Sequence, residues 1–172
     1  YERQVTENLM FGVEESIRYA DDVIIITNCT DYPKNAAGSV KYDDYSVICI
    51  NNSSSPYKNT IVKGRIYTKE KLTDPEKMLF NKGFYDDYSY NTSFTATSYD
   101  LTTTVEMYKL DKDGNKSHSL TNKSTIKLLN LDLNKTTIKM IDANSASPVI
   151  PADLATPTGK DNGNTYILYH KP

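Results

Sequence analysis

One segment constrains the fold of this sequence more than any other: it has the hydrophobic periodicity of a helix and leads directly into a β-branched run. Its apolar residues recur at every fourth position, which places them along one stripe of a helix: Val5, Leu9, Val13 and Ile17. The pattern predicts an amphipathic helix over residues 1–20. Because no capping residue precedes it, we expect this helix to be the second half of a longer one. The run Val23–Ile26 then predicts a strand that is buried on both faces.

The rest of the chain is rich in strand and turn signals. The predicted strands cover Ser46–Asn51, Ile61–Thr68, Thr102–Leu110, Ser124–Asn130, Thr136–Ile141 and Tyr166–His170. A short helix is expected near 75–82, because Asp74 is a good N-cap and Gly83 can end the last turn. Asp113-Gly114 predicts a hairpin, and the proline-rich residues 142–164 predict a long surface loop. We therefore expect one α+β domain with a pilin-like arrangement, in which the N-terminal helix packs on an antiparallel sheet.

Two cysteines, Cys29 and Cys49, each lie in an apolar strand-like run. A disulfide between neighbouring strands and a pair of buried free thiols are both compatible with this placement. Neither cysteine has a histidine or a second cysteine at the spacing of metal ligands, which argues against a zinc site.

Catalytic patterns are hard to find in the sequence. His118 and His170 have no serine, cysteine or aspartate at a spacing that indicates a triad. Residues 111–115 begin like a calcium loop, but Asn122 stands where the bidentate glutamate would be, so a plain hairpin turn is the better interpretation. We predict a protein that is not an enzyme and has no cofactor and no metal.

Basic residues gather in two blocks within a chain whose net charge is only −2. Residues 58–82 and 107–140 each carry seven basic and three acidic residues, and tyrosines lie among them. If both blocks met on one face, they would form a positive stripe that suits a phosphate backbone. The candidate DNA-binding residues are Lys63, Arg65, Lys69, Lys71, Lys109, Lys112, Lys116, Lys123, Lys127, Lys135 and Lys139. The alternative interpretation is that these side chains solvate the open faces of strands.

The first 26 residues resemble the inner helix and first strand of a type IV filament subunit, of the minor pilin and pseudopilin kind represented by PilW and GspJ. The residues that match are Arg3-Gln4, Glu14-Glu15, Ile17-Arg18, Ala20-Asp21 and Val23–Ile26. The cleavage site and hydrophobic half-helix of that family are absent, and so is the cysteine pair that closes the C-terminal loop of many pilins.

The resemblance implies a structural subunit of an extracellular, cell-surface filament that contributes to assembly, adhesion or biofilm formation. Its partners would be other pilin subunits and extracellular DNA, and a segment preceding this sequence would anchor it in the membrane before assembly. Val5, Leu9, Val13 and Ile17 would pack on the sheet or on neighbouring subunits.

A second class of protein is also compatible with the sequence. The stretch TTTVEMYKLDKDGNK, residues 102–116, is typical of a strand and turn in β-sandwich adhesion domains and lipoproteins of Gram-positive surfaces. This alternative gives no reason for the N-terminal helix, whereas the filament hypothesis does.

Overall fold

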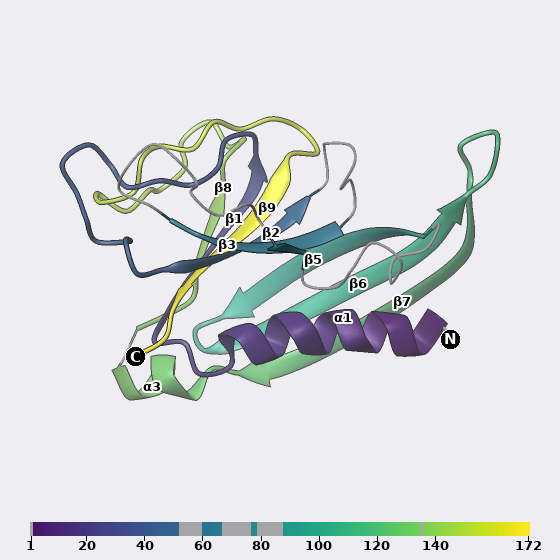
Figure 1. Cartoon of the computed structure of the whole chain (residues 1–172), viewed down its shortest axis with the longest axis horizontal. Coiled ribbons are helices and arrows are strands. Elements are labelled where there is room, and N and C mark those ends of the chain that lie inside the picture. The colour runs from purple at the N-terminus through teal and green to yellow at the C-terminus, as the bar shows by residue number, and fades with distance from the viewer. Residues whose placement is uncertain (1, 52–59, 67–76, 79–87, 135) are drawn as a thin grey trace.

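The computed structural model describes residues 2–51, 60–66, 77–78, 88–134 and 136–172. These residues form two β-sheets and two helices (Figure 1). In chain order the elements are α1 (Glu2–Ile17), β1 (Asp22–Cys29), β2 (Ser46–Asn51), β3 (Thr60–Arg65), β4 (Lys77–Met78), β5 (Ser89–Thr97), β6 (Asp100–Leu110), β7 (Lys116–Lys127), α3 (Leu129–Asn134), β8 (Lys139–Asp142) and β9 (Asn164–His170).

The larger sheet has six strands in the order β4-β3-β2-β9-β1-β8. Its centre is built from the β-branched run of β1, in which Val23, Ile24, Ile25 and Ile26 are all fully buried. The C-terminal strand β9 lies between β1 and β2 and is antiparallel to both. β8 is parallel to β1 and forms one edge of the sheet.

The smaller sheet is a meander of three strands in the order β5-β6-β7. The β6–β7 hairpin is long, and Figure 1 shows its tip extending away from the rest of the molecule. Its turn is stabilised by Asp111, whose Oδ1 accepts hydrogen bonds from the backbone N–H groups of Asp113 and Asn115 at 2.9 and 2.8 Å. Gly114 has a φ of 82°, a conformation that glycine adopts without steric cost.

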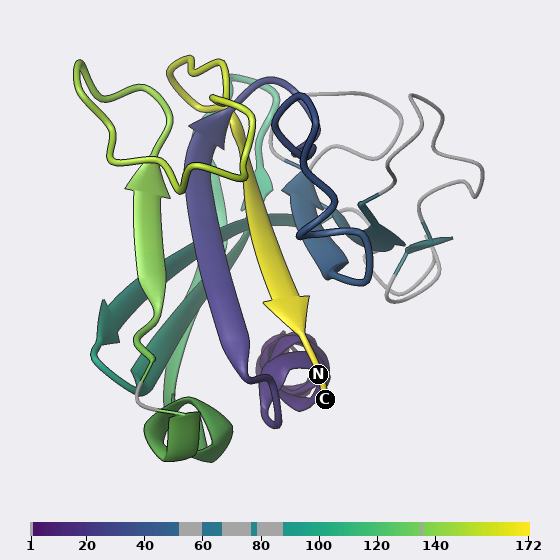
Figure 2. The ribbon, with the colours of Figure 1, turned by 90° about the vertical axis from the view of Figure 1, so that its left-hand side faces the viewer.

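Apolar side chains on the two faces of the larger sheet form two separate clusters. One cluster joins the sheet to α1 and to the smaller sheet, with Ile25, Ile167, Leu101 and Met107 among its members. Figure 2 shows the smaller sheet and α1 on this side of the larger sheet. The other cluster includes Ile24 and Ile26 together with residues of the loops that follow β1 and β8. Both faces of β1 are therefore buried, as its sequence predicts.

The loops that cover the second face approach β1 closely. A Cβ on Gly159 would lie 2.1 Å from the carbonyl oxygen of Ala143, and one on Gly163 would lie 2.5 Å from the carbonyl carbon of Asn28. Both distances are shorter than any Cβ contact that a protein can accommodate. Glycine is thus required at both positions for the C-terminal loop to pack against the end of β1 and the residues that follow β8.

Helix α1 lies against β6 and β7. The predicted stripe of Leu9, Val13 and Ile17 is buried in the first cluster, with exposed fractions of 0%, 1% and 0%. The side chain of Val5 lies outside the described part of the chain. Asn122 on β7 donates a hydrogen bond to the hydroxyl of Thr6, which adds a polar contact to this apolar packing.

The expectation of a pilin-like α+β fold, with one N-terminal helix on an antiparallel sheet, is wrong. Strands make up 47% of the described residues and form two sheets, whereas α1 is a short helix of 16 residues. The larger sheet is also not purely antiparallel, because β8 pairs with β1 in the parallel direction. The body of the protein is therefore a two-sheet β structure to which α1 is added.

Two local predictions are also corrected. A helix was expected near 75–82, but Lys77–Met78 forms strand β4, which pairs with β3, and the other residues of that segment lie outside the described chain. Residues 131–135 were expected to join two strands without regular structure, but Leu129–Asn134 forms helix α3. At β4, pairing with β3 outweighs the local capping signals.

Candidate functional site

The side of the β5-β6-β7 sheet that is turned away from the apolar cluster forms a polar surface, which we call the outer face. Strand register aligns its residues in four rows. The rows are Asn91, Glu106 and Thr121; Ser93, Thr104 and Lys123; Thr95, Thr102 and Thr125; and Thr97, Asp100 and Lys127. No described residue in these rows is fully buried, so hydroxyl, amide and charged groups are presented to solvent.

Alternation along β5 and β6 produces this surface. On β6, Leu101, Thr103, Val105 and Met107 are buried, whereas Thr102, Thr104 and Glu106 lie on the outer face. Successive side chains of a strand point to opposite sides, so this pattern gives the sheet one dry and one wet side. Threonine suits such a wet side because its branched Cβ favours the strand while its hydroxyl remains solvated.

At the hairpin end of the outer face, Glu106 and Lys116 form an ion pair. The Lys116 Nζ atom lies 2.7 Å from Glu106 Oε1 and 4.5 Å from the centre of the Tyr108 ring. The hydrogen bond from Lys116 lowers the pKa of Glu106, and a second hydrogen bond from Asn91 acts in the same direction. The same bond raises the pKa of Lys116. Both groups are consequently charged at neutral pH and hold the base of the hairpin.

The two predicted basic blocks do not form one stripe within the described chain. Lys116, Lys123 and Lys127 share the outer face, and Lys112 lies in the turn beyond it. Lys109 lies on the opposite side of the sheet, where its Nζ atom is 4.6 Å from the centre of the Tyr88 ring.

The remaining candidates are dispersed or not described. Lys63 lies on β3, with its Nζ atom 6.0 Å from the centre of the Tyr169 ring, on the side of the larger sheet that faces the first cluster. Lys139 is exposed on β8. The structure does not describe Lys69, Lys71, Lys135 or the side chain of Arg65.

Charges of both signs occur on the outer face and hairpin tip. Four lysines are accompanied by the four carboxylates of Asp100, Glu106, Asp111 and Asp113. Asp100 stands opposite Lys127 in the strand register, and Glu106 is paired with Lys116. Lys112 and Lys123 are left as the cations best placed to contact an anionic ligand.

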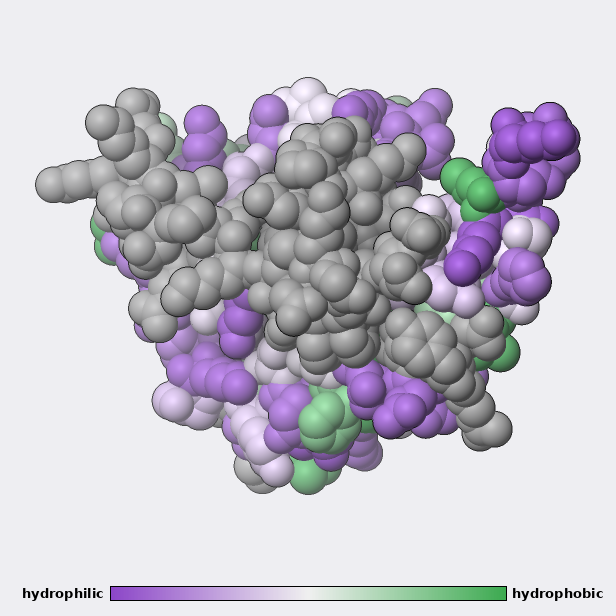
Figure 3. Space-filling view, turned by 45° about the vertical axis from the view of Figure 1, so that its right-hand side comes forward, coloured by the Kyte–Doolittle hydropathy of each residue, from purple (hydrophilic) through white to green (hydrophobic). Residues whose placement is uncertain are grey.

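The tip of the hairpin combines this charge with apolar exposure. Figure 3 shows the tip as a hydrophilic projection with a hydrophobic patch beside it. The side chain of Leu110, the last residue of β6, is 54% exposed. A projecting turn with an exposed leucine is a natural point of contact for another molecule.

Sequence reasoning missed a cluster around His170. Its Nδ1 atom lies 2.7 Å from Asp21 Oδ1 and its Nε2 atom 2.8 Å from Asp44 Oδ2. Tyr45 donates its hydroxyl proton to Asp22, and the Tyr45 and His170 rings lie 5.4 Å apart. No sequence signal could have found this arrangement, because Asp21 is 149 positions away from the histidine.

The cluster favours a charged imidazolium. Partial burial by itself lowers the pKa of His170, but the hydrogen bonds and charges of Asp21 and Asp44 together raise it above the ordinary 6.5. Burial and the hydrogen bond to Asp22 raise the pKa of Tyr45, which stays protonated. With both ring nitrogens donating to carboxylates, the imidazole joins the start of β1, the end of β9 and the loop before β2.

The two cysteines are free thiols, which is one of the two alternatives that the sequence allows. Both lie in the second apolar cluster, with exposed fractions of 0% for Cys29 and 3% for Cys49. Burial raises the pKa of Cys29 to about 11, so its reactive thiolate form is scarce at neutral pH.

Among the described residues, no three histidine, cysteine, aspartate or glutamate side chains are grouped so that they could hold a metal ion. The described helices include none that is long and apolar enough to cross a membrane. No family model, curated protein or solved structure matches this chain.

Proposed function

We propose that this chain is a non-enzymatic adhesion domain displayed on a cell surface, with the outer face and the β6–β7 hairpin as its contact surface. The observation that carries the proposal is the outer face itself, on which three long strands present hydroxyl, amide and lysine groups in aligned rows. The opposite side of the same strands is core, so a rigid scaffold holds the rows in place.

The two-sheet architecture favours this class of protein over a filament subunit. Two sheets that share an apolar cluster are the basic plan of a β-sandwich. Sandwich domains commonly use a sheet surface or end loops for recognition, because these positions tolerate polar variation without disturbing the core. Adhesion domains of Gram-positive surfaces were the alternative that the sequence left open.

Extracellular DNA is the ligand that we propose for this surface. Lys112, Lys116, Lys123 and Lys127 lie along the hairpin and one edge strand, and such a row can follow a phosphate backbone. Because lysine supplies point charges and the nearby carboxylates offset part of them, the binding should be weak and independent of base sequence.

A mobility shift of an unrelated DNA duplex tests this ligand. With two to three lysines on phosphates, we expect the affinity to fall roughly 10- to 40-fold between 50 and 200 mM salt. Charge reversal by Lys112→Glu, Lys123→Glu and Lys127→Glu should abolish the shift. The matched control carries the same change away from the outer face, at Lys139, Lys160 and Lys171. Absence of a shift at low salt, or an equal loss in the control, would rule out DNA binding at the outer face.

The adhesion function is tested separately with protein-coated beads. Beads that carry the wild-type chain should adhere to the biofilm matrix of the producing organism more strongly than beads coated with an inert protein. Treatment with DNase distinguishes DNA from other matrix polymers. Equal adherence of both kinds of bead would contradict the adhesion proposal itself.

A structural subunit of an extracellular type IV pilus is the second candidate, and one observation favours it. Phe11 is 59% exposed on the solvent side of α1, which leaves an aromatic contact for another pilin subunit. This candidate is a role in filament assembly, and it does not depend on a pilin-like fold. The sequence that precedes Tyr1 in the precursor decides it: a cleavage site followed by about 20 apolar residues would support membrane anchoring before assembly, whereas a lipobox or ordinary signal peptide would exclude it.

A further inference from the structure

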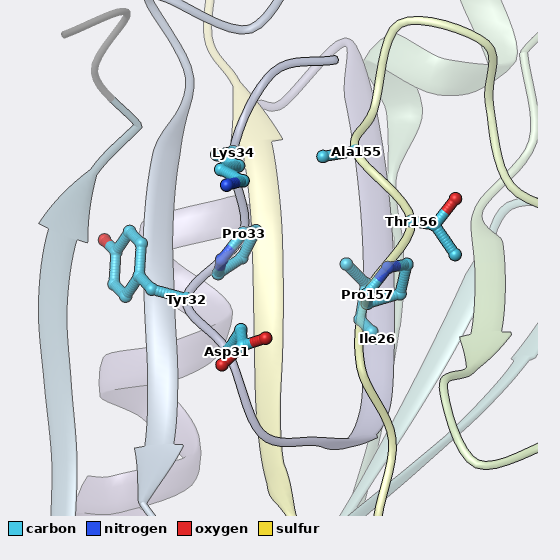
Figure 4. A pocket seen from close by; sticks show the side chains of 8 residues that line it. All are labelled: Ile26, Asp31, Tyr32, Pro33, Lys34, Ala155, Thr156 and Pro157. Atoms are coloured by element: carbon cyan, nitrogen blue, oxygen red, sulfur yellow. The ribbon is translucent and has the colours of Figure 1, made fainter. Parts of the chain in front are cut away.

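The loops that follow β1 and β8 enclose a hollow of about 390 Å³ on the loop-covered side of the larger sheet. Figure 4 shows Asp31 and Pro33 on one side of it and Ala155 and Pro157 on the other. Ile26 of β1 also lines the hollow. Tyr32 and Thr156 complete its lining. From this geometry we infer that the hollow is a binding site for a small zwitterion of dipeptide size.

The shape of the hollow follows from an interruption in the backbone pairing of the two loops. The loops pair on one side through the N–H of Thr30, which donates to Thr158 O at 2.8 Å. On the other side the N–H of Ala155 donates to Lys34 O at 3.0 Å. Between these bonds Pro33 and Pro157 have no N–H group to continue the pairing. The hollow is therefore closed at both ends and accommodates a short molecule rather than a chain that passes through.

The chemistry of the lining indicates a ligand with two charges. Asp31 and Lys34 are both exposed, and neither side chain forms an ion pair or hydrogen bond within the described chain. Their Cα atoms are at most about 11 Å apart, because they lie three positions apart in the chain. A dipeptide spans about 7 Å between its ammonium and carboxylate groups, and the flexible lysine stem can cover the difference.

The apolar part of the lining fits the body of such a ligand. Ala155 and Pro157 offer short, rigid apolar contacts, above the buried side chains of Ile26 and Pro33. Few rotatable groups would have to be ordered on binding, which lowers the entropic cost. Small side chains such as alanine suit the volume, and hollows of this size are typical of small-molecule sites.

Titration with L-alanyl-L-alanine tests the inference by NMR, with the backbone amides as probes. We expect saturable shifts at Ile26, Asp31, Lys34 and Ala155. Asp31→Asn and Lys34→Gln should each weaken binding about tenfold or more, because each removes a charge-assisted hydrogen bond. Lys171→Gln, at an exposed position outside both the hollow and the outer face, should leave the affinity unchanged.

N-acetyl-L-alanyl-L-alanine amide is the matched control ligand, because it keeps the shape and lacks both charges. It should bind at least tenfold more weakly than the zwitterion. Absence of saturable shifts up to about 10 mM dipeptide, corresponding to affinities weaker than millimolar, would overturn the inference. Equal binding of the blocked ligand, or unchanged affinity in both charge variants, would also overturn it. Spectra of the variants outside the hollow check that the fold is intact.

Discussion

His170 shows how a single side chain joins three segments of this protein. The imidazole contacts Asp21 before β1 and Asp44 before β2, and it is itself the last residue of β9. Its raised pKa means that folding stabilises the charged form. Such linkage makes the stability of the fold depend on pH.

The direction of this dependence follows from the sign of the pKa shift. A group whose folded pKa lies above its unfolded value contributes its full stabilisation below the unfolded value, here 6.5. The contribution is lost as the pH rises through the folded pKa. We therefore expect the difference in urea midpoint between the wild type and His170→Gln to be largest near pH 5.5 and to shrink toward pH 9.

NMR titration of the His170 ring provides the direct measurement. Its midpoint should lie above 6.5, and Asp21→Asn should lower it, because that change removes a carboxylate that accepts the Nδ1 proton. A midpoint at or below 6.5, or a urea difference that stays constant with pH, would show that the imidazolium is not stabilised by folding.

At the scale of elements, α1 is held by its apolar stripe and by few polar contacts. Leu9, Val13 and Ile17 are buried, and Asn130 from α3 donates to the carbonyl of Tyr19 just beyond the helix at 2.5 Å. A helix of 16 residues is marginal in isolation. Its stability must therefore come from packing on β6 and β7.

Leu9→Ala should accordingly destabilise the protein by about 2–5 kcal/mol, through lost burial and the cavity that remains. Asn8→Ala is the matched control, because Asn8 is exposed on the same turn and should change stability by less than about 0.5 kcal/mol. Urea denaturation measures both. A similar small effect for the two variants would mean that α1 contributes little to the fold.

At the scale of the whole molecule, the larger sheet separates two apolar clusters that share β1, β2 and β9. Alternate residues of these strands enter different clusters, so neither cluster can be lost without exposing the other side of the same strand. The sheet thereby couples α1 and the smaller sheet to the loops on the far side.

The buried thiols report on this coupling. Cys29 and Cys49 should resist alkylation in the native protein and react together as urea unfolds it, because both lie in the second cluster. The labelled fraction, measured by intact mass, should follow the same urea transition as circular dichroism. Labelling of either cysteine well before that transition would show that the loop-covered side opens independently.

Sequence reasoning succeeded where the pattern was local and failed where pairing decided the structure. The helix over residues 1–20 is confirmed as α1 with an earlier end, Ser46–Asn51 is confirmed as β2, and the Asp113-Gly114 turn is confirmed. The parallel pairing of β8 with β1 was not predictable, because Ile24 and Lys139 are more than a hundred positions apart. The division into two sheets is likewise set by tertiary packing.

The candidate site was also predictable only in part from the sequence. Alternation over Thr102–Leu110 predicted a strand with two different sides, and the outer face is one of them. The basic blocks were defined by proximity in sequence. Successive side chains of a strand point to opposite faces, however, and Lys109 and Lys116 lie on opposite sides of one hairpin. The hollow between the two loops carried no sequence signal beyond its prolines, since its two walls lie more than 120 positions apart.

The antiparallel pairing of β1 with β9 has a mechanical consequence. Asp22 pairs with His170, so the start of one strand lies beside the end of the other. A force that pulls these two points apart would peel the strands one hydrogen bond at a time, which resists little tension. A force applied between Asp22 and the hairpin tip would instead load the interface of the two sheets as a whole. An adhesion domain held at its N-terminal side and loaded through the hairpin would then be stressed in its stronger direction.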